Sequence, residues 1–124
     1  MLINFSNHPS SVWSKEQLDA AKQYGDIIDE SFPAVPPDAS EKEIRMMANA
    51  YILKIVGLMM NSGQPDEPSA IHIMGEMTLT FAIVQRLIKE GITCLASTTM
   101  REVTFDKDGN KVATFHFVKF RKYE

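Results

Sequence analysis

Residues 70–96 read AIHIMGEMTLTFAIVQRLIKEGITCLA, and this stretch decides the predicted fold. Its first five residues form a short, mainly apolar run that is typical of a buried strand. From Thr78 onward, apolar side chains recur at spacings of three and four, which predicts a helix, and Gly91 is a typical residue to end it. The last five residues are apolar again. The stretch therefore predicts a strand–helix–strand unit.

The same alternation continues toward the N-terminus. Ser14 with Gln17 and Ser40 with Glu43 have the spacing of capping boxes, which predicts a helix after each serine. Strands are expected at residues 1–5 and 26–32, and a turn-rich loop at 61–66.

At the C-terminal end, residues 101–106 and 111–120 flank Asp108-Gly109, a pair that strongly favours a β-hairpin. Alternating strands and helices favour a mostly parallel sheet covered on both faces. We therefore predict an α/β fold, a three-layer Rossmann-like, mostly parallel sheet with a C-terminal antiparallel β-hairpin, in a single domain over residues 1–124.

Composition narrows the function classes. The chain has 124 residues and a formal net charge of -3, which argues against general binding of duplex nucleic acid. The single Cys94 cannot form an internal disulfide, and no cysteine pattern or His/Asp/Glu cluster suggests a metal site. We expect no metal and no cofactor. Without a long apolar run, we expect no signal peptide or membrane span, and a cytoplasmic protein.

Polar segments follow three of the expected strands: residues 6–11 (SNHPSS), 75–78 (GEMT) and 97–101 (STTMR). Ligands of open parallel sheets bind beyond the carboxyl ends of the strands, so we expect these segments to gather around one crevice. Hydroxyls, helix N-termini and an arginine suit phosphate oxygens, and a histidine can move a proton. The candidate side chains are Ser6, His8, Ser10, Ser11, Glu76, Thr78, Thr98, Thr99 and Arg101.

Most of these residues also have a purely structural interpretation, but Glu76, beside Gly75, shows no structural role in the sequence. Ser14 and Thr78 are N-cap candidates, and His8 before Pro9 can simply stabilise a turn. His72, inside an apolar strand, is expected to be a core histidine with its hydrogen bonds satisfied. Cys94 is expected to pack rather than react. The methionines around residues 45–47 and 58–60 fit either core filling or a partner surface.

Four segments, in order, resemble the small stand-alone CRISPR-associated ring nucleases of the CARF-like type. They are Phe5-Ser6-Asn7-His8 followed by Gln17, Met74-Gly75-Glu76-Met77-Thr78-Leu79-Thr80-Phe81, Ala96-Ser97-Thr98-Thr99-Met100-Arg101, and Phe115-His116-Phe117-Val118-Lys119-Phe120-Arg121-Lys122-Tyr123. The resemblance covers most of the chain. Proteins of that family have a Rossmann-like fold and degrade cyclic oligoadenylate second messengers.

The resemblance implies a homodimer that binds cyclic oligoadenylate of type III CRISPR immunity, most simply cyclic tetra-adenylate. It implies metal-independent attack by a ribose 2′-hydroxyl, which gives linear oligoadenylate with a 2′,3′-cyclic phosphate. His8 is the first candidate for proton transfer and Glu76 the second, with Arg101 as the third catalytic candidate. The implied ligand-binding residues are Ser6, Asn7, Ser10, Ser11, Gly75, Thr78, Ser97, Thr98 and Thr99.

Two other functions stay open. The same crevice could hold a cyclic nucleotide without cutting it, as a sensor or sponge. A housekeeping enzyme acting on a mononucleotide or sugar phosphate is the third hypothesis, although no G-x-G-x-x-G or G-x-x-x-x-G-K-[ST] pattern follows any expected strand.

Overall fold

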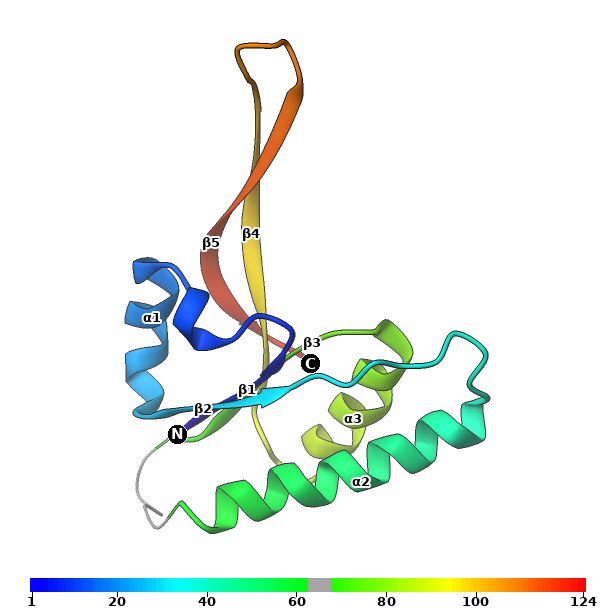
Figure 1. Ribbon diagram of the computed structural model, residues 1–124. Helices are drawn as coiled ribbons and strands as arrows, with labels where there is room; N and C mark the ends of the chain where they lie inside the picture. The colour runs from blue at the N-terminus through cyan, green and yellow to red at the C-terminus, as the bar shows by residue number, and fades with distance from the viewer. Residues whose placement is uncertain (63–67) are drawn as a thin grey trace.

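A computed structural model of the chain describes residues 1–62 and 68–124 (Figure 1). The strands are β1 (Leu2–Ser6), β2 (Ile27–Ser31), β3 (Ala70–Met74), β4 (Cys94–Phe105) and β5 (Lys111–Lys122). The helices are α1 (Lys15–Ala21), α2 (Glu41–Met60) and α3 (Met77–Lys89), with short 3-10 turns at Ser10–Val12 and Lys22–Tyr24. Most of the loop expected at residues 61–66 lies outside the described residues.

The strands form one sheet in the order β2-β1-β3-β4-β5. The pairs from β2 to β4 are parallel, and β4 pairs with β5 in antiparallel fashion. The predicted α/β fold, a mostly parallel sheet with a C-terminal hairpin, is confirmed. Strand β1 is central, and the strand order reverses between β1 and β3, which is where open sheets of this kind bind ligands.

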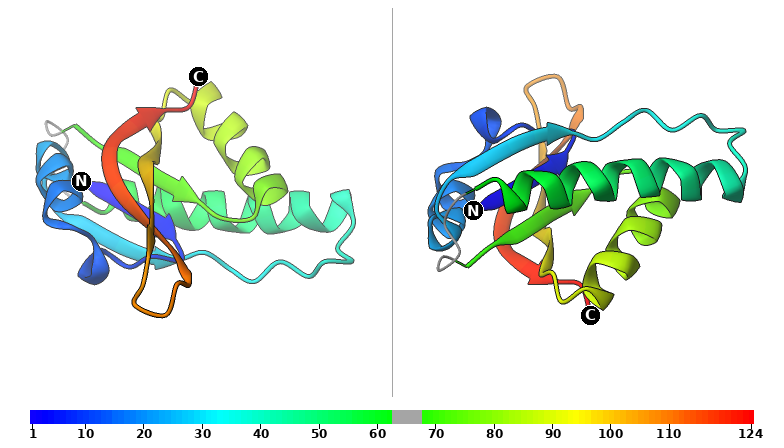
Figure 2. Two further views of the ribbon diagram at one scale, coloured as in Figure 1. Left: turned by 90° about the horizontal axis from the view of Figure 1, so that it is seen from above. Right: turned by 90° about the horizontal axis from the view of Figure 1, so that it is seen from below.

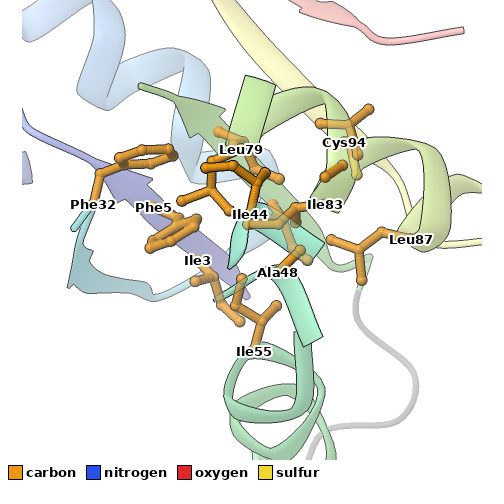
Figure 3. Packing of buried hydrophobic residues seen from close by; sticks show 14 of the residues in the cluster. Ile3, Phe5, Phe32, Ile44, Ala48, Ile55, Leu79, Ile83, Leu87 and Cys94 are labelled. Carbon is orange, nitrogen blue, oxygen red and sulfur yellow. The ribbon is translucent and has the colours of Figure 1, made fainter. Parts of the chain in front are cut away.

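The helices cover both faces of the sheet. Neighbouring residues of a strand point to opposite faces. Ile3 and Phe5 pack among apolar residues of α2 and α3 (Figure 3), whereas Leu2 packs with Trp13 and with Ala21 of α1. The sheet therefore lies between α2 and α3 on one side and α1 on the other. Figure 2 shows this arrangement from above and from below. This is the expected three-layer order.

Two predicted helix starts are confirmed, and one is wrong. Ser40 and Glu43 form both bonds of a capping box, and the Ser14 hydroxyl accepts a hydrogen bond from the backbone N–H of Gln17. Helix α3, however, is capped by Glu76 and not by Thr78. A carboxylate at this position can accept several of the free N–H groups of the first turn.

Residues 97–101 were expected to follow a strand, and this expectation is wrong. These residues belong to β4, which runs to Phe105 because β5 pairs with it along its length, apart from an irregularity at Thr98/Thr99. The hairpin turn comes at Asp106–Asn110, where Gly109 adopts a φ of 77° and the Asp106 carboxylate accepts two backbone N–H groups. The hairpin extends far beyond the helices (Figure 1).

Within the described ranges, none of the helices is both long enough and apolar enough to cross a membrane.

Candidate functional site

A chain of hydrogen-bonded polar side chains crosses the sheet on the α1 side. Asn4 of β1 lies opposite Asp29 of β2 and opposite His72 of β3 in the strand register. The Asn4 amide nitrogen donates to the Asp29 carboxylate at 2.7 Å, and the Asn4 amide oxygen lies 2.8 Å from Nδ1 of His72. Nε2 of His72 lies 2.8 Å from the hydroxyl of Ser97 in β4. We call Asp29, Asn4, His72 and Ser97 the polar chain.

The partners of Asn4 fix the direction of each hydrogen bond. Its amide nitrogen faces the Asp29 carboxylate and the backbone carbonyl of His8, and both groups can only accept. Its oxygen must therefore accept, so Nδ1 of His72 carries the ring proton and Nε2 has a free lone pair. Ser97 then donates its proton to Nε2, and its oxygen accepts a hydrogen bond from the Gln17 side chain at 3.1 Å.

Burial makes this arrangement rigid. Asn4 and His72 are 1% and 2% exposed, so an unpaired polar atom on either would be costly. Burial, together with the nearby His8, lowers the pKa of His72 from 6.5 to about 4. His72 is therefore neutral at pH 7. Partial burial alone would raise the pKa of Asp29, but hydrogen bonds from Asn4 and Ser10 outweigh it and lower this pKa.

The polar chain ends at a pocket of about 340 Å³, which we call the α1-side pocket. It lies at the strand-order reversal between β1 and β3, where the loop after β1 approaches the base of the hairpin (Figure 1). Its lining combines two histidines, two hydroxyls, an amide and an apolar wall. The lining residues are His8, Val12, Trp13, Gln17, His72, Met74, Ser97, Thr99 and Phe115.

His8 is held by its backbone rather than by its ring. Its carbonyl oxygen accepts hydrogen bonds from Asn4 at 2.8 Å and from the indole N–H of Trp13 at 3.0 Å. The side chain is exposed and lines the α1-side pocket. The two interpretations of His8 thus coexist, because the turn is fixed through the main chain while the imidazole remains accessible to a ligand.

The other residues predicted after β1 are used inside the protein or lie elsewhere. The Ser6 hydroxyl is buried and lies 2.8 Å from the Asn4 amide oxygen, and the Ser10 hydroxyl donates to Asp29 at 2.7 Å. Asn7 and Ser11 are exposed and do not line the α1-side pocket. Ser6 and Ser10 are therefore hydrogen-bonded to Asn4 and Asp29 of the polar chain.

The segment at residues 75–78 serves the start of α3. The Glu76 carboxylate accepts hydrogen bonds from the backbone N–H of Leu79 and from the N–H and hydroxyl of Thr78, and these bonds lower its pKa. A β-carbon on Gly75 would lie 2.5 Å from the ring of Phe32, so this glycine makes room for core packing. Glu76, which seemed from the sequence to lack a structural task, has one.

The β4 candidates are divided by strand alternation. Ser97 and Thr99 point toward the α1-side pocket, whereas the Thr98 hydroxyl bonds to the backbone of Lys119. Arg101 is exposed, lies on the same face of β4 as Thr99 and pairs with Phe115, but does not line the pocket. The structure thus brings together three of the predicted residues: His8, Ser97 and Thr99.

Sequence reasoning missed Asn4, His72 and Trp13 as parts of this site. His72 was expected to be a core histidine with its bonds satisfied, and it is, but it also reaches the pocket through Ser97. A polar residue at the middle of two neighbouring apolar strands, Asn4 in LINFS and His72 in AIHIM, was the available signal. Because the strand register was unknown, their pairing could not be predicted.

A second pocket, of about 360 Å³, lies on the other side of Met74, and its lining is mainly apolar: Met74, Gly75, Met77, Thr80, Phe81, Val84 and Tyr123. The described part of the chain holds no group of three or more His, Cys, Asp or Glu residues suited to a metal ion.

One protein-family model matches the chain. It is described as the Uncharacterized protein MJ1673 family, and the match covers residues 1–121. None of the curated proteins and none of the solved structures compared with the chain matches it.

Proposed function

The chain belongs to the Uncharacterized protein MJ1673 family, and we propose that it is a ring nuclease acting on the cyclic oligoadenylates of type III CRISPR immunity. The observation that carries the proposal is the α1-side pocket at the strand-order reversal, with His8, Ser97 and Thr99 facing it. Cyclic tetra-adenylate is the proposed substrate. The products would be linear oligoadenylate with a 2′,3′-cyclic phosphate and a free 5′-hydroxyl.

The lining supports a nucleotide ligand. Trp13 and Phe115 provide aromatic surface for an adenine base, and bases stack on aromatic side chains with about 1–3 kcal/mol per base. Ser97 and Thr99 offer hydroxyls to phosphate and ribose oxygens. The described lining holds no lysine or arginine, so His8 is its candidate for charge on a phosphate, and Arg101 lies farther out on the same face of β4.

The proposed reaction needs no nucleophile from the protein, because the substrate supplies its own; the protein has to hold the reacting atoms in line. The ribose 2′-hydroxyl attacks the adjacent phosphorus while the bond from phosphorus to the 5′-oxygen breaks. Holding these atoms in line can lower the barrier by several kcal/mol. A general acid that gives a proton to the departing 5′-oxygen contributes a further factor of about 10²–10⁴ in rate. We assign this role to His8.

A homodimer is part of the proposal. The pocket volume of about 340 Å³ is at the low end of small-molecule sites, roughly 300–1,000 Å³, so one copy would hold only part of a ring. The projecting hairpin exposes large apolar side chains: Met100 is 65% and Phe105 71% exposed. An isolated two-stranded hairpin is marginally stable in water. A second copy that packs against the hairpin would bury these side chains and duplicate the pocket around a two-fold axis.

The test is direct. Purified protein is incubated with cyclic tri-, tetra- and hexa-adenylate in the presence of EDTA, and the products are separated by chromatography. Linear product from cyclic tetra-adenylate is the expected result. Intact rings of every size after prolonged incubation, with no retention by the protein, would refute the proposal.

The chain provides a matched control for His8. His116 is an exposed histidine on the hairpin, where its Nε2 lies 2.9 Å from the Glu102 carboxylate, and it does not line the α1-side pocket. His8→Ala is expected to slow single-turnover cleavage at least 100-fold with little change in ring affinity, while His116→Ala stays near wild type. Equal loss in both variants would remove His8 from proton transfer.

A non-catalytic sensor or sponge is the second candidate, and one observation favours it. Of the three catalytic residues expected from the sequence, Glu76 is engaged in capping α3 and Arg101 does not line the pocket. Stoichiometric retention of cyclic tetra-adenylate without cleavage in the test above would establish this alternative.

A further inference from the structure

The proposed reaction needs a base for the 2′-hydroxyl as well as an acid for the leaving oxygen, and the α1-side pocket holds a second histidine. His72 is almost fully buried but is part of the pocket lining, and its Nε2 lies 2.8 Å from the Ser97 hydroxyl. Ser97 is half-buried and lines the pocket. The hydroxyl of Ser97 is thus the point at which the polar chain meets a ligand.

We propose that Ser97 receives the proton of the attacking 2′-hydroxyl and passes its own proton to Nε2 of the buried His72. The inference rests on the proposed function for its substrate. In chemical terms, the 2′-oxygen forms a bond to phosphorus as its proton moves to Oγ of Ser97. The original Ser97 proton moves to Nε2 of His72. The bond from phosphorus to the 5′-oxygen breaks, and that oxygen takes a proton from protonated His8.

The geometry sets every proton in this sequence beforehand. Asn4 holds Nδ1 of His72 in the protonated form, which leaves the Nε2 lone pair toward Ser97. The Gln17 side chain donates to the Ser97 oxygen at 3.1 Å and thereby turns the Ser97 proton toward His72. When His72 becomes positively charged, Nδ1–H donates more strongly to Asn4, whose amide in turn donates to the Asp29 carboxylate at 2.7 Å. The amide of Asn4 thus connects the imidazole to the Asp29 carboxylate. Burial and the nearby His8 lower the pKa of His72 to about 4, so the ring would hold the proton only transiently.

Two aromatic rings pack against the His72 imidazole. Edge-on rings of Trp13 and Phe120, with centroids 5.4 and 5.5 Å from the imidazole, enclose it on the α1 side. His72 is 2% exposed, and its ring nitrogens are hydrogen-bonded to Asn4 and Ser97. The hydrogen bond between Ser97 and Nε2 is the path by which a proton would reach the imidazole.

Ser97 is the residue that would touch the substrate, and His72 acts through it. Ser97→Ala is expected to reduce single-turnover cleavage of cyclic tetra-adenylate about 100-fold while ring affinity changes less than threefold. Ser97→Thr keeps a hydroxyl and is expected to recover most of the rate. Thr104→Ala, farther along the same strand, is the matched control and stays near wild type. Loss of affinity equal to loss of rate in Ser97→Ala would contradict the inference.

A second experiment tests the Ser97–His72 pair without any nucleotide. The Ser97→Cys thiol should be alkylated by iodoacetamide at neutral pH at least tenfold faster than it is in the double variant with His72→Gln, because the imidazole assists loss of the thiol proton. Glutamine can still bond to both Asn4 and position 97, so the double variant is expected to fold, which thermal melting checks. The native Cys94 contributes little, since burial raises its pKa to about 11.

The two experiments separate the possible failures. Equal alkylation rates with and without His72 would overturn the inference even if rings are cleaved. Faster alkylation in the presence of His72, combined with no cleavage of any ring by the wild type, would support the paired hydroxyl and imidazole and refute the proposed substrate.

Discussion

Alternate residues of the same strands form an apolar core on one face of the sheet and a hydrogen-bonded polar chain on the other. On the α2 and α3 side, Phe5 and its neighbours form an apolar core in which the rings of Phe5 and Phe32 lie 4.9 Å apart. On the α1 side, one residue along, Asn4 begins a polar chain that ends at an open pocket. The first face holds the larger apolar cluster. On the second face, buried polar groups are hydrogen-bonded to one another and reach the α1-side pocket.

The contrast indicates that buried polar residues are good markers of a candidate site in a small α/β domain. A buried polar residue is tolerated only when its hydrogen bonds are complete. Here Asn4 and His72 have partners for their polar atoms, and one series of these bonds joins Asn4 through His72 to Ser97. A core designed for stability alone would use apolar residues at these positions, because a fully satisfied polar network is rarely more stable than apolar packing.

The largest difference between the faces is expected in global stability. Phe5→Ala removes a fully buried ring from the α2 and α3 side and should lower the free energy of unfolding by about 3–5 kcal/mol. Urea unfolding followed by circular dichroism measures the change. Val12→Ala, which removes an exposed apolar side chain on the α1 side, should stay within about 0.5 kcal/mol. Similar losses for both variants would contradict the assignment of the core to one face.

Lowering the pH should reduce the stability of the folded protein through His72, on the α1 side of the sheet. Its pKa falls from 6.5 to about 4 on folding, so below pH 6.5 the unfolded chain binds a proton that the folded chain does not. The stability from neutral His72 is complete above pH 6.5 and is lost as the pH falls toward 4, by about 3 kcal/mol in total. His8 and, through Asn4, Asp29 are the ionisable groups nearest to this ring along its contacts.

The measurement is urea unfolding at several pH values between 7 and 4 for the wild type and His72→Gln. Both proteins lose stability from other groups, so the difference in slope isolates His72. Parallel slopes would show that His72 binds a proton equally well in the folded and unfolded chains.

Gly75→Ala tests whether Gly75 is needed for packing against Phe32 or for close approach of a ligand. The added β-carbon would meet the Phe32 ring at 2.5 Å, and such overpacking typically lowers stability by about 1–3 kcal/mol. If Gly75 served only close approach of a ligand, the same substitution would weaken ring binding and leave the melting temperature unchanged. Thermal melting together with ring affinity distinguishes the two outcomes.

The smallest change in monomer stability is expected on the hairpin. The double substitution Met100→Ser with Phe105→Ser removes exposed apolar side chains and should convert the proposed dimer to a monomer in light scattering, with little change in far-UV circular dichroism. Met46→Ser with Met60→Ser, two exposed methionines on α2, is the control and should keep the dimer. Dissociation only in the α2 variant would place the contact on that helix.

Much of the fold could be predicted because local signals agreed with each other. Strand β3 and the capping box of Ser40 occur where the sequence placed them. Residues 97–101 were wrongly expected to lie beyond the end of a strand, because they are polar. Pairing with β5 holds them in β4, and local propensity does not include such a contact between segments. The Glu76 cap was missed because the serine and threonine preference at N-caps favoured Thr78.

The candidate site was only partly predictable for a related reason. His8, Ser97 and Thr99 could be placed near each other from the general position of ligands in parallel sheets. The polar chain depends on the register that puts Asn4 between Asp29 and His72, and a shift of one residue would have sent Asn4 to the opposite face. No pattern within a single strand specifies that register.

The most direct test of the site is to follow the three histidine imidazole resonances by NMR while cyclic tetra-adenylate is added to the EDTA-treated protein. Two of the rings, those of His8 and His72, line the α1-side pocket, and the third, that of His116, lies on the hairpin beside Glu102. We predict that the His8 and His72 resonances shift together with ligand concentration and that His116 does not. A shift of His116 alone, or unchanged resonances for His8 and His72 at saturating ring, would contradict a ligand site on the α1 side of the sheet.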